Sequence, residues 1–334
     1  IKANGNLRKL WELRLSELAG GKITDAKAHV VSISFSPDGH RLAAVVWSRL
    51  QRNKLTLVIL DVNSPRVNSQ MLEYEGPGGE TISWSPTGKE VAVPEVFQEI
   101  GQPPCILEHT VRAVFYGPDQ VADGQPGFPQ TDLRFYNVHC ALVGLWKIDG
   151  MWPLSDGSAE RQLLALANNV PKKTQILVVD PVRKRTVNRW PLKDTAWAWA
   201  LFADTGKAIC ALDGTAAHGV AHCWDVDSGR EIARTHSGNP QVSFAAALRA
   251  KRLVLSDYGW KIDFEGWQTE VGALHRRVVW DFGTGNEIAS WKPSYQDDVV
   301  HPTVKEPYRA AISPDGTMVA EGGAGALKLS RIEP

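Results

Sequence analysis

The sequence predicts an all-β protein that repeats one four-stranded antiparallel unit, and three observations carry the prediction. Turns of the type Ser-Pro-Asp-Gly recur between short apolar segments. The stretch CWDVDSGREI (223–232) is nearly repeated as VWDFGTGNEI (279–288). The best apolar runs, such as LTLVILDV (55–62), have strand length and fall well short of the roughly 20 residues that a membrane-spanning helix needs. No membrane insertion is therefore expected.

The repeated turns each join two strands. Pro presets φ, Asp hydrogen-bonds locally, and Gly takes a positive φ, so Ser-Pro-Asp-Gly reverses the chain efficiently. Apolar residues alternate before each turn and a β-branched or aliphatic strand follows. Four copies are clear: ISFSPDGHRLAAV (33–45), ISWSPTGKEVAV (82–93), ALFADTGKAICAL (200–212) and AAISPDGTMVAE (310–321). Three are weaker: AVFYGPDQVA (113–122), WPLSDGSAERQLLAL (152–166) and SFAAALRAKRLVL (243–255).

The spacing of these copies predicts a β-propeller. From Gly39 to Gly316 the seven copies recur on average about every 46 residues, close to the roughly 40–45 residues of a four-stranded propeller blade. Each copy must then supply a third and a fourth strand. In CWDVDSGREI, Trp-Asp closes the third strand, the Gly-bearing turn reverses the chain, and Glu-Ile opens the fourth. The near-duplicate at 279–288 does the same one blade later.

These residues resemble the WD40-like β-propeller repeat family. The resemblance is carried by Trp224-Asp225, by Trp280-Asp281, and by the turns at 36–39 and 313–316, and it covers nearly the whole chain. The Gly-His pair that the family places before the first strand is missing, which is typical of a divergent, bacterial-looking member. The resemblance implies the fold and is nearly silent on function, because propellers scaffold, bind and catalyse.

The chain is expected to form a single propeller domain over residues 1–334. Seven blades are favoured, at about 28–75, 78–110, 111–149, 150–192, 193–236, 238–293 and from 305 onward. The last blade is one strand short, and LWELRLSEL (10–18), within an N-terminal segment of residues 1–27, is expected to supply that strand and close the ring. Closure matters because an open propeller leaves unpaired edges. The alternative is six blades with a flanking N-terminal extension.

The cysteines bear on the compartment. The chain has four, at 105, 140, 210 and 223, with no CxxC spacing. Cys210 and Cys223 flank a loop and would face each other across a hairpin, within reach of a disulfide. The other pair would then be Cys105–Cys140, and four buried free thiols are the alternative. The even count, together with an N-terminus at Ile1 rather than Met, favours a processed periplasmic or extracellular chain over a cytoplasmic one.

Charge and motifs argue against several functions. Lys+Arg and Asp+Glu are both 37, so no broad basic face for nucleic acid is expected. The sequence has no GxSxG, no HExxH and no phosphate loop. His218 and His222 lie beside Cys223, but residues four apart on a strand are about 13 Å apart, too far for one metal. We therefore expect no catalytic residue, no metal and no cofactor.

One long insertion is the best candidate for binding. SDYGWKIDFEGWQTEVGALHRR (256–277) is far longer than a hairpin needs, and its aromatic residues indicate packing, either on its own blade or against a partner. A smaller analogue, WSRLQRNK (47–54), mixes one aromatic residue with cations. The candidate partner-binding residues of these two hairpins are Tyr258, Trp260, Phe264, Trp267, Trp47, Arg49 and Arg52.

Two polar segments receive plainer interpretations. YQDDVVH (295–301) lies between blades six and seven, and a solvated loop is favoured over a ligand contact. RKRTVNR (183–189) lies on the opposite, turn side of blade four, where it is expected to serve solubility.

Together these features predict a non-catalytic interaction scaffold whose loops on one face bind another protein, and a subunit of a larger assembly is one form that such a scaffold takes. The alternative is a propeller enzyme, lactonase-like or dehydrogenase-like, that uses the central channel.

Overall fold

The computed structural model describes most of the chain. The described residues are 6–17, 28–48, 54–65, 69–75, 82–93, 96–100, 104–107, 112–125, 127, 129–168, 174–192, 200–215, 218–235, 241–262, 268–292, 310–323 and 325–333. Among them, no helix is long and apolar enough to cross a membrane.

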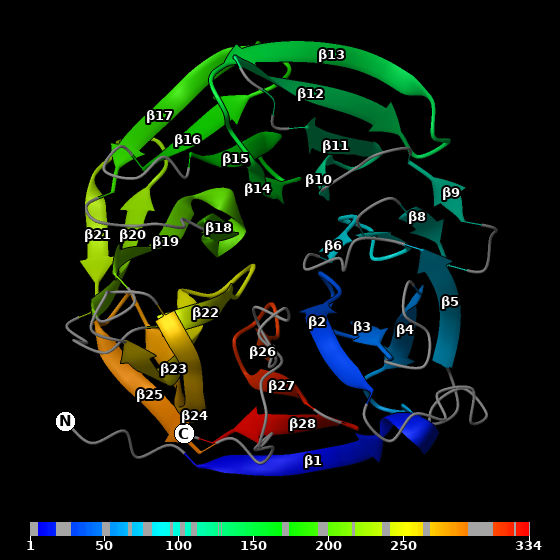
Figure 1. The fold of residues 1–334 in the computed structure, drawn as a ribbon, viewed down its shortest axis with the longest axis vertical. Helices are drawn as coiled ribbons and strands as arrows, with labels where there is room; N and C mark the ends of the chain where they lie inside the picture. The colour runs from blue at the N-terminus through cyan, green and yellow to red at the C-terminus, as the bar shows by residue number, and fades with distance from the viewer. Residues whose placement is uncertain are drawn as a thin grey trace.

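The described strands form seven four-stranded sheets arranged around a ring, and neighbouring strands in every sheet are antiparallel (Figure 1). In chain order, blade one contains β2 (His29–Phe35), β3 (Arg41–Trp47), β4 (Lys54–Asp61) and β5 (Ser69–Glu75); blade two, β6 (Ser83–Trp84), β7 (Glu90–Val93), β8 (Val96–Glu99) and β9 (Cys105–Ile106); blade three, β10 (Ala113–Gly117), β11 (Gln120–Gln125), β12 (Gln130–Asn137) and β13 (Leu142–Asp149). Blade four contains β14 (Leu154–Ser158), β15 (Leu163–Asn168), β16 (Gln175–Asp180) and β17 (Arg185–Pro191); blade five, β18 (Ala200–Ala203), the 3-10 turn η2 (Asp204–Gly206), β19 (Ala208–Thr215), β20 (His218–Asp225) and β21 (Glu231–Arg234); blade six, β22 (Gln241–Ala246), β23 (Arg252–Ile262), β24 (Gln268–Asp281) and β25 (Asn286–Trp291); blade seven, β26 (Ala310–Ile312), β27 (Met318–Gly323), β28 (Ala326–Ile332) and β1 (Leu7–Arg14).

The strand order places one end of each sheet at the centre of the ring. In Figure 1 the first strand of each blade, such as β2 or β14, lies nearest the centre, and the last, such as β13 or β17, forms the rim. Successive strands reverse direction, so the turns after the first and third strands lie on one face of the ring. We call this the turn face. Connections between the second and third strands lie on the other, the hairpin face. The prediction of an all-β antiparallel propeller is confirmed.

The N-terminal strand completes the last sheet. β1 pairs with β28 from Leu7↔Ile332 to Arg14↔Ala326, with one irregularity between Lys9 and Trp11. Leu13 and Leu15 are buried in the apolar cluster between blades seven and one. The sequence predicts this pairing for residues 10–18, whereas the strand begins earlier, at Leu7, and ends at Arg14.

The repeated turn sequences have one physical explanation. The Ser36 hydroxyl donates to Asp38 at 2.6 Å, and Ser313 donates to Asp315 at the same distance. Gly39 and Gly316 take φ of 75° and 73°, which disfavours any side chain there. In the Trp-Asp turn of blade five, Asp225 accepts from the Ser228 N–H at 2.7 Å. The repeated letters therefore encode turn geometry.

The core is divided among the seams between blades. Each of the seven seams holds one cluster of buried apolar side chains among the described residues. At the seam of blades four and five, for example, Trp190 stacks on Trp224 with ring centroids 5.7 Å apart. Because each blade packs only against its two neighbours, the ring is held together by seven similar interfaces.

Two disulfides reinforce this frame. Cys210 and Cys223 are fully buried register partners on β19 and β20, with Cα atoms 4.1 Å apart. Cys105 on β9 and Cys140, in the turn before β13, are joined with Cα atoms 6.3 Å apart and link blade two to blade three. The predicted hairpin disulfide is confirmed, and the alternative of four free thiols is not what the structure shows.

Candidate interaction surface

Blade six carries a two-stranded ribbon that extends beyond its sheet. β22 pairs with β23 only as far as Asp257, and β25 pairs with β24 only as far as Arg277. Beyond the pair Asp257↔Arg276, residues 258–262 and 268–275 pair only with each other. We call these two segments the blade-six ribbon. The sequence predicts a long insertion here, and the structure shows that its two ends are strand rather than loop.

The blade-six ribbon is irregular in one strand only. β24 is 14 residues long and β23 is 11, and the register shifts at three points, each of which leaves one extra residue on β24. Such bulges bend a strand and increase its local twist. We therefore expect the three bulges to bend the ribbon relative to the sheet from which it extends.

A buried ion pair lies at the base of the ribbon. Arg277 on β24 donates to Glu321 on β27 of blade seven at 2.6 Å, and the two side chains are 1% and 2% exposed. The Trp291 indole also donates to Glu321, at 2.8 Å, and the Ser256 hydroxyl lies 3.3 Å from Arg277 Nε. Ser256 and Arg277 are the register pair next to Asp257 and Arg276, the last pair before the ribbon. An isolated hairpin is only marginally stable, so this cluster anchors the ribbon to blade seven.

The structure describes two of the four residues predicted for the ribbon. Tyr258 and Trp260 lie on β23, where their backbones pair with Leu274 and Val271. Phe264 and Trp267 lie outside the described residues, between the two strands. Of the four predicted residues, Tyr258 and Trp260 therefore lie on the described part of the ribbon.

The second predicted hairpin is in blade one, on the same face. Trp47 ends β3, is partly buried, and stacks on His29 with ring centroids 6.0 Å apart. It packs against the apolar cluster between blades one and two. Arg49 and Arg52 lie outside the described residues. Of this predicted hairpin, the described part therefore includes Trp47, held in a stacked aromatic pair at the end of β3.

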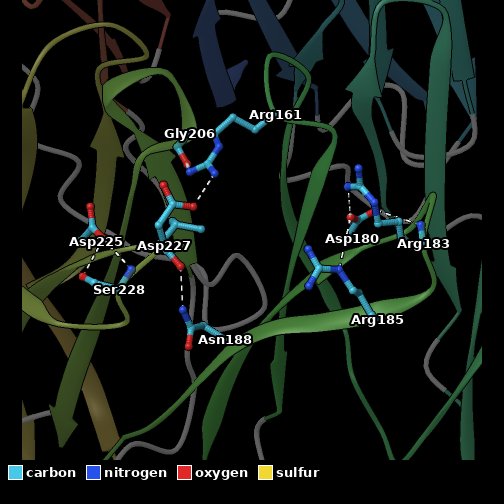
Figure 2. Close-up of polar contacts among 10 residues, drawn as sticks. Arg161, Asp180, Arg183, Arg185, Asn188, Gly206, Asp225, Asp227 and Ser228 are labelled. Carbon is cyan, nitrogen blue, oxygen red and sulfur yellow. Dashed lines mark hydrogen bonds and ion pairs between the residues drawn. The ribbon is translucent and has the colours of Figure 1, made fainter.

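The turn face, by contrast, is tied together by charge. Arg161, in the turn after β14, reaches across to blade five, where it pairs with Asp227 at 2.5 Å and donates to the Gly206 carbonyl at 3.4 Å (Figure 2). Asn188 donates to the Val226 carbonyl at 2.6 Å. Hydrogen bonds from Ser228 hold the pKa of Asp225 below its ordinary value. These groups hold neighbouring turns together.

The other candidate features lie apart from one another in the described part of the chain. Within the described residues, no three His, Cys, Asp or Glu side chains gather to hold a metal ion. His222 is hydrogen-bonded to Glu231 at 3.1 Å and stacks on Trp224.

A cavity of ≈ 270 Å³ lies on the turn face, where blades six, seven and one meet. It is lined by both acids and arginines, including Asp38, Asp315, Arg249 and Arg331. The segment YQDDVVH, with Asp297, Asp298 and His301, lies outside the described residues.

Sequence reasoning missed the groups that meet only in space. Arg277 and Glu321 are 44 residues apart, and nothing in their local sequence signals the pair.

Asp123 on β11 is fully buried, and its carboxylate has no hydrogen-bond partner among the described residues. Burial raises the pKa of Asp123 to about 7, although the positive charge of Arg134 acts in the opposite direction. A charged residue at an inward strand position was the available signal, as Asp123 lies between Ala122 and Gly124.

Comparison with known proteins identifies the fold. No protein-family model matches this chain, and no curated protein sequence matches it. A chain in the crystal structure of the mitotic checkpoint complex is 11% identical and aligns over 98% of this chain and 96% of its own length, with a TM-score of 0.62. The β-propeller domain of Cps50 (Swd1) from Myceliophteria thermophila is 11% identical over 98% and 100%, with a TM-score of 0.68.

The second of these neighbours is a β-propeller domain, so the comparison and the seven sheets agree that this chain has a β-propeller fold, as the Trp-Asp and Ser-Pro-Asp-Gly motifs predict. Likeness at 11% identity shows the fold alone.

Proposed function

We propose that this chain is a non-catalytic, seven-bladed interaction scaffold that binds another protein through its hairpin face. The observation that carries the proposal is the blade-six ribbon, which leaves its sheet after Asp257 and is anchored at its base by Arg277 and Glu321. A ring held by seven apolar seams supplies a rigid platform, and a ribbon that extends beyond its sheet supplies a surface for contact with a partner.

The composition of the two hairpins supports a protein partner. Tyr and Trp dominate binding energy at protein interfaces, and Arg is the next most enriched residue there. Tyr258, Trp260, Phe264 and Trp267 supply the aromatic groups in the ribbon, and Trp47, Arg49 and Arg52 belong to the blade-one hairpin on the same face. The chain has no net charge, which does not favour nucleic acid as the main partner. One structural neighbour comes from a multiprotein complex, which supports the same class of function.

The test compares partner capture by matched variants of the intact chain. Trp260→Ala and Trp267→Ala should each weaken capture of a specific partner by at least about tenfold, because truncating an interface hot spot costs about 2 kcal/mol or more. Ile232→Ala, at an exposed apolar position on the rim of blade five, is the control and should capture the partner unchanged. A partner set identical for all three variants would disprove the role of the ribbon.

We also propose a periplasmic or extracellular location, because both cysteine pairs are disulfides and such bonds persist in oxidising compartments. Intact mass spectrometry of the native protein, with and without reductant, tests this. Four alkylatable thiols in freshly isolated protein would point to the cytoplasm instead. The same spectrum tests the alternative of a channel enzyme, which predicts the added mass of a cofactor or metal.

A further inference from the structure

The rim of blade three differs from the other rims. β13 is the outermost strand of its sheet, and Figure 1 shows it at the edge of the ring. Leu142, Val143 and Leu145 on this strand are 59%, 55% and 43% exposed. Among the rim strands whose side chains are described, no other exposes more than one large apolar residue. Exposed edges of this kind pair readily with another chain, and proteins normally protect them with charge.

The backbone of β13 offers free hydrogen-bonding groups at this edge. Gly150 N–H bonds to the Pro129 carbonyl, so the alternation of an antiparallel ladder directs the backbone groups of Gly144, Trp146 and Ile148 toward β12. The N–H and C=O groups of Leu145 and Lys147 then point outward. The position of Lys184 agrees, because its ammonium group reaches the Leu145 carbonyl from blade four at 3.4 Å.

The turn that reaches this edge is strongly basic. It joins β16 to β17 and contains Arg183, Lys184 and Arg185. Both arginines approach the same buried carboxylate, Asp180, at 2.8 and 3.7 Å, as Figure 2 shows. One carboxylate offsets one of these three cations, so the turn keeps an excess of two positive charges. The arginine side chains are still 71% and 61% exposed. A run that the sequence assigns to solubility is thus held in place beside an apolar strand edge.

We propose that the β13 edge binds an extended acidic segment of a partner protein by strand addition. The incoming backbone bonds to the outward groups of Leu145 and Lys147, and its N–H displaces Lys184 from the Leu145 carbonyl. Alternate side chains contact Val143 and Leu145, and its carboxylates pair with the basic turn. Main-chain bonds give such complexes affinity, and alternate side chains give them specificity.

A single peptide strand is the occupant that the charges favour. An added strand lies about 4.8 Å from β13, in the position that the Lys184 side chain vacates when it is displaced from the Leu145 carbonyl. A second copy of this chain would bring its own Arg183, Lys184 and Arg185 to the same interface, and the doubled positive charge would oppose pairing. The proposed site is on the rim, away from the blade-six ribbon, and does not rest on the function proposed for that ribbon.

The experiment is selection of a random linear peptide library on the intact protein. The peptides that bind should alternate apolar residues with Asp or Glu, and their affinity should fall about tenfold or more between low and high salt. With a selected peptide bound, the amide hydrogens of Leu145 and Lys147 should exchange at least about tenfold more slowly, because they become hydrogen-bonded.

Leu145→Pro is the sharpest variant. It removes one outward N–H and breaks no bond to β12, and Pro is tolerated at strand edges. Binding should fall by at least about tenfold. Val143→Asp leaves the backbone intact but adds a negative charge and should weaken binding as much, whereas Ile232→Asp on the blade-five rim should not.

Several results would overturn the proposal. One is a set of selected peptides that are basic or lack alternation, and another is binding to the variants at Val143 and Leu145 as tight as to the original chain. Unchanged exchange at Leu145 and Lys147 in the bound state would exclude strand addition even if a variant failed to fold. A concentration-dependent dimer that Val143→Asp dissolves would assign the edge to a second copy of the chain.

Discussion

Arg277 and Glu321 are the most deeply buried ion pair among the described residues, and they join blade six to blade seven. Taking two charges out of water is costly, and the pair is tolerated because each has polar neighbours: Ser256 for the arginine, Trp291 and Lys328 for the glutamate. The intact pair therefore adds little to the free energy of unfolding, whereas removal of one member costs much because the other charge stays buried without a partner.

Glu321→Ala should destabilise the fold by about 3–5 kcal/mol, because it leaves the Arg277 charge buried without a partner. Urea unfolding at neutral pH measures the effect. The double variant Arg277→Met/Glu321→Leu is the control and should recover most of the loss, since an apolar pair of similar volume replaces both charges. A double variant as unstable as the single one would show that charge is not the cause.

Asp123 makes stability depend on pH. Burial raises the pKa of Asp123 to about 7, so the folded chain keeps this proton where the unfolded chain, with a pKa near 3.8, has lost it. Between about pH 4 and 7 the folded state therefore binds more protons than the unfolded state. The free energy of unfolding falls as the pH rises through that window, because ionising Asp123 is costlier in the folded chain.

Asp123→Asn should flatten this dependence and make the protein more stable than the original chain at pH 8. Urea midpoints at pH 5 and pH 8 for both proteins test the prediction. Equal pH slopes for the two proteins would mean that Asp123 is ionised in the folded state.

At the scale of elements, blade two is the weakest sheet. β6 and β9 contain only two residues each, and the sequence around VFQEIGQPPCILEH (96–109) hardly reads as strand. The Cys105–Cys140 bond compensates by fixing β9 to blade three. A covalent link between elements 35 residues apart stabilises mainly by restricting the unfolded chain.

Cys105→Ser/Cys140→Ser should therefore cost about 2–4 kcal/mol of unfolding free energy, measured by urea titration. Hydrogen exchange should rise first in β8 and β9, since these short strands lose their tether. The matched comparison is Cys210→Ser/Cys223→Ser, whose loss should accelerate exchange in blade five instead. Exchange that rises uniformly around the ring would contradict this local role.

The sequence was informative about elements wherever turn chemistry repeats. Ser-Pro-Asp-Gly and Trp-Asp with a Gly turn locate the turns of blades one, five, six and seven, because those turns admit few alternatives. The strand bounds were less exact, since β1 covers residues 7–14 rather than 10–18, and β23 and β24 extend into the predicted insertion. The blade-six ribbon was recognised by its aromatic residues, but its three bulges were not, since a bulge in β24 has no sequence signal of its own. The apolar rim of β13 was also overlooked, because the position of β13 at the rim follows from the strand order of its sheet, which its local sequence does not signal.

At the scale of the whole molecule, the ring depends on β1. This strand comes from the start of the chain and pairs with β28 at its end, so the two termini of the fold are joined through one sheet. Leu13 and Leu15 are buried at the seam with blade one, and each contributes about 1.5–3 kcal/mol by leaving water.

Deleting residues 1–17 should lower the melting temperature by several degrees and cause aggregation on heating, because the edge of β28 becomes exposed. Thermal unfolding with light scattering measures both effects. Deleting only residues 1–5 keeps β1 intact and should change neither. A chain that melts unchanged without β1 would show that the ring does not need this closure.

The measurement that tests the central claim most directly is the hydrogen-exchange footprint of a captured partner on the intact chain. A scaffold that binds through its hairpin face should show protection in the blade-six ribbon, at residues 258–275, with the turn face around Arg161 and Asp227 unchanged. Protection confined to the turn face or to the inner strands that surround the channel, with the ribbon unaffected, would contradict the account.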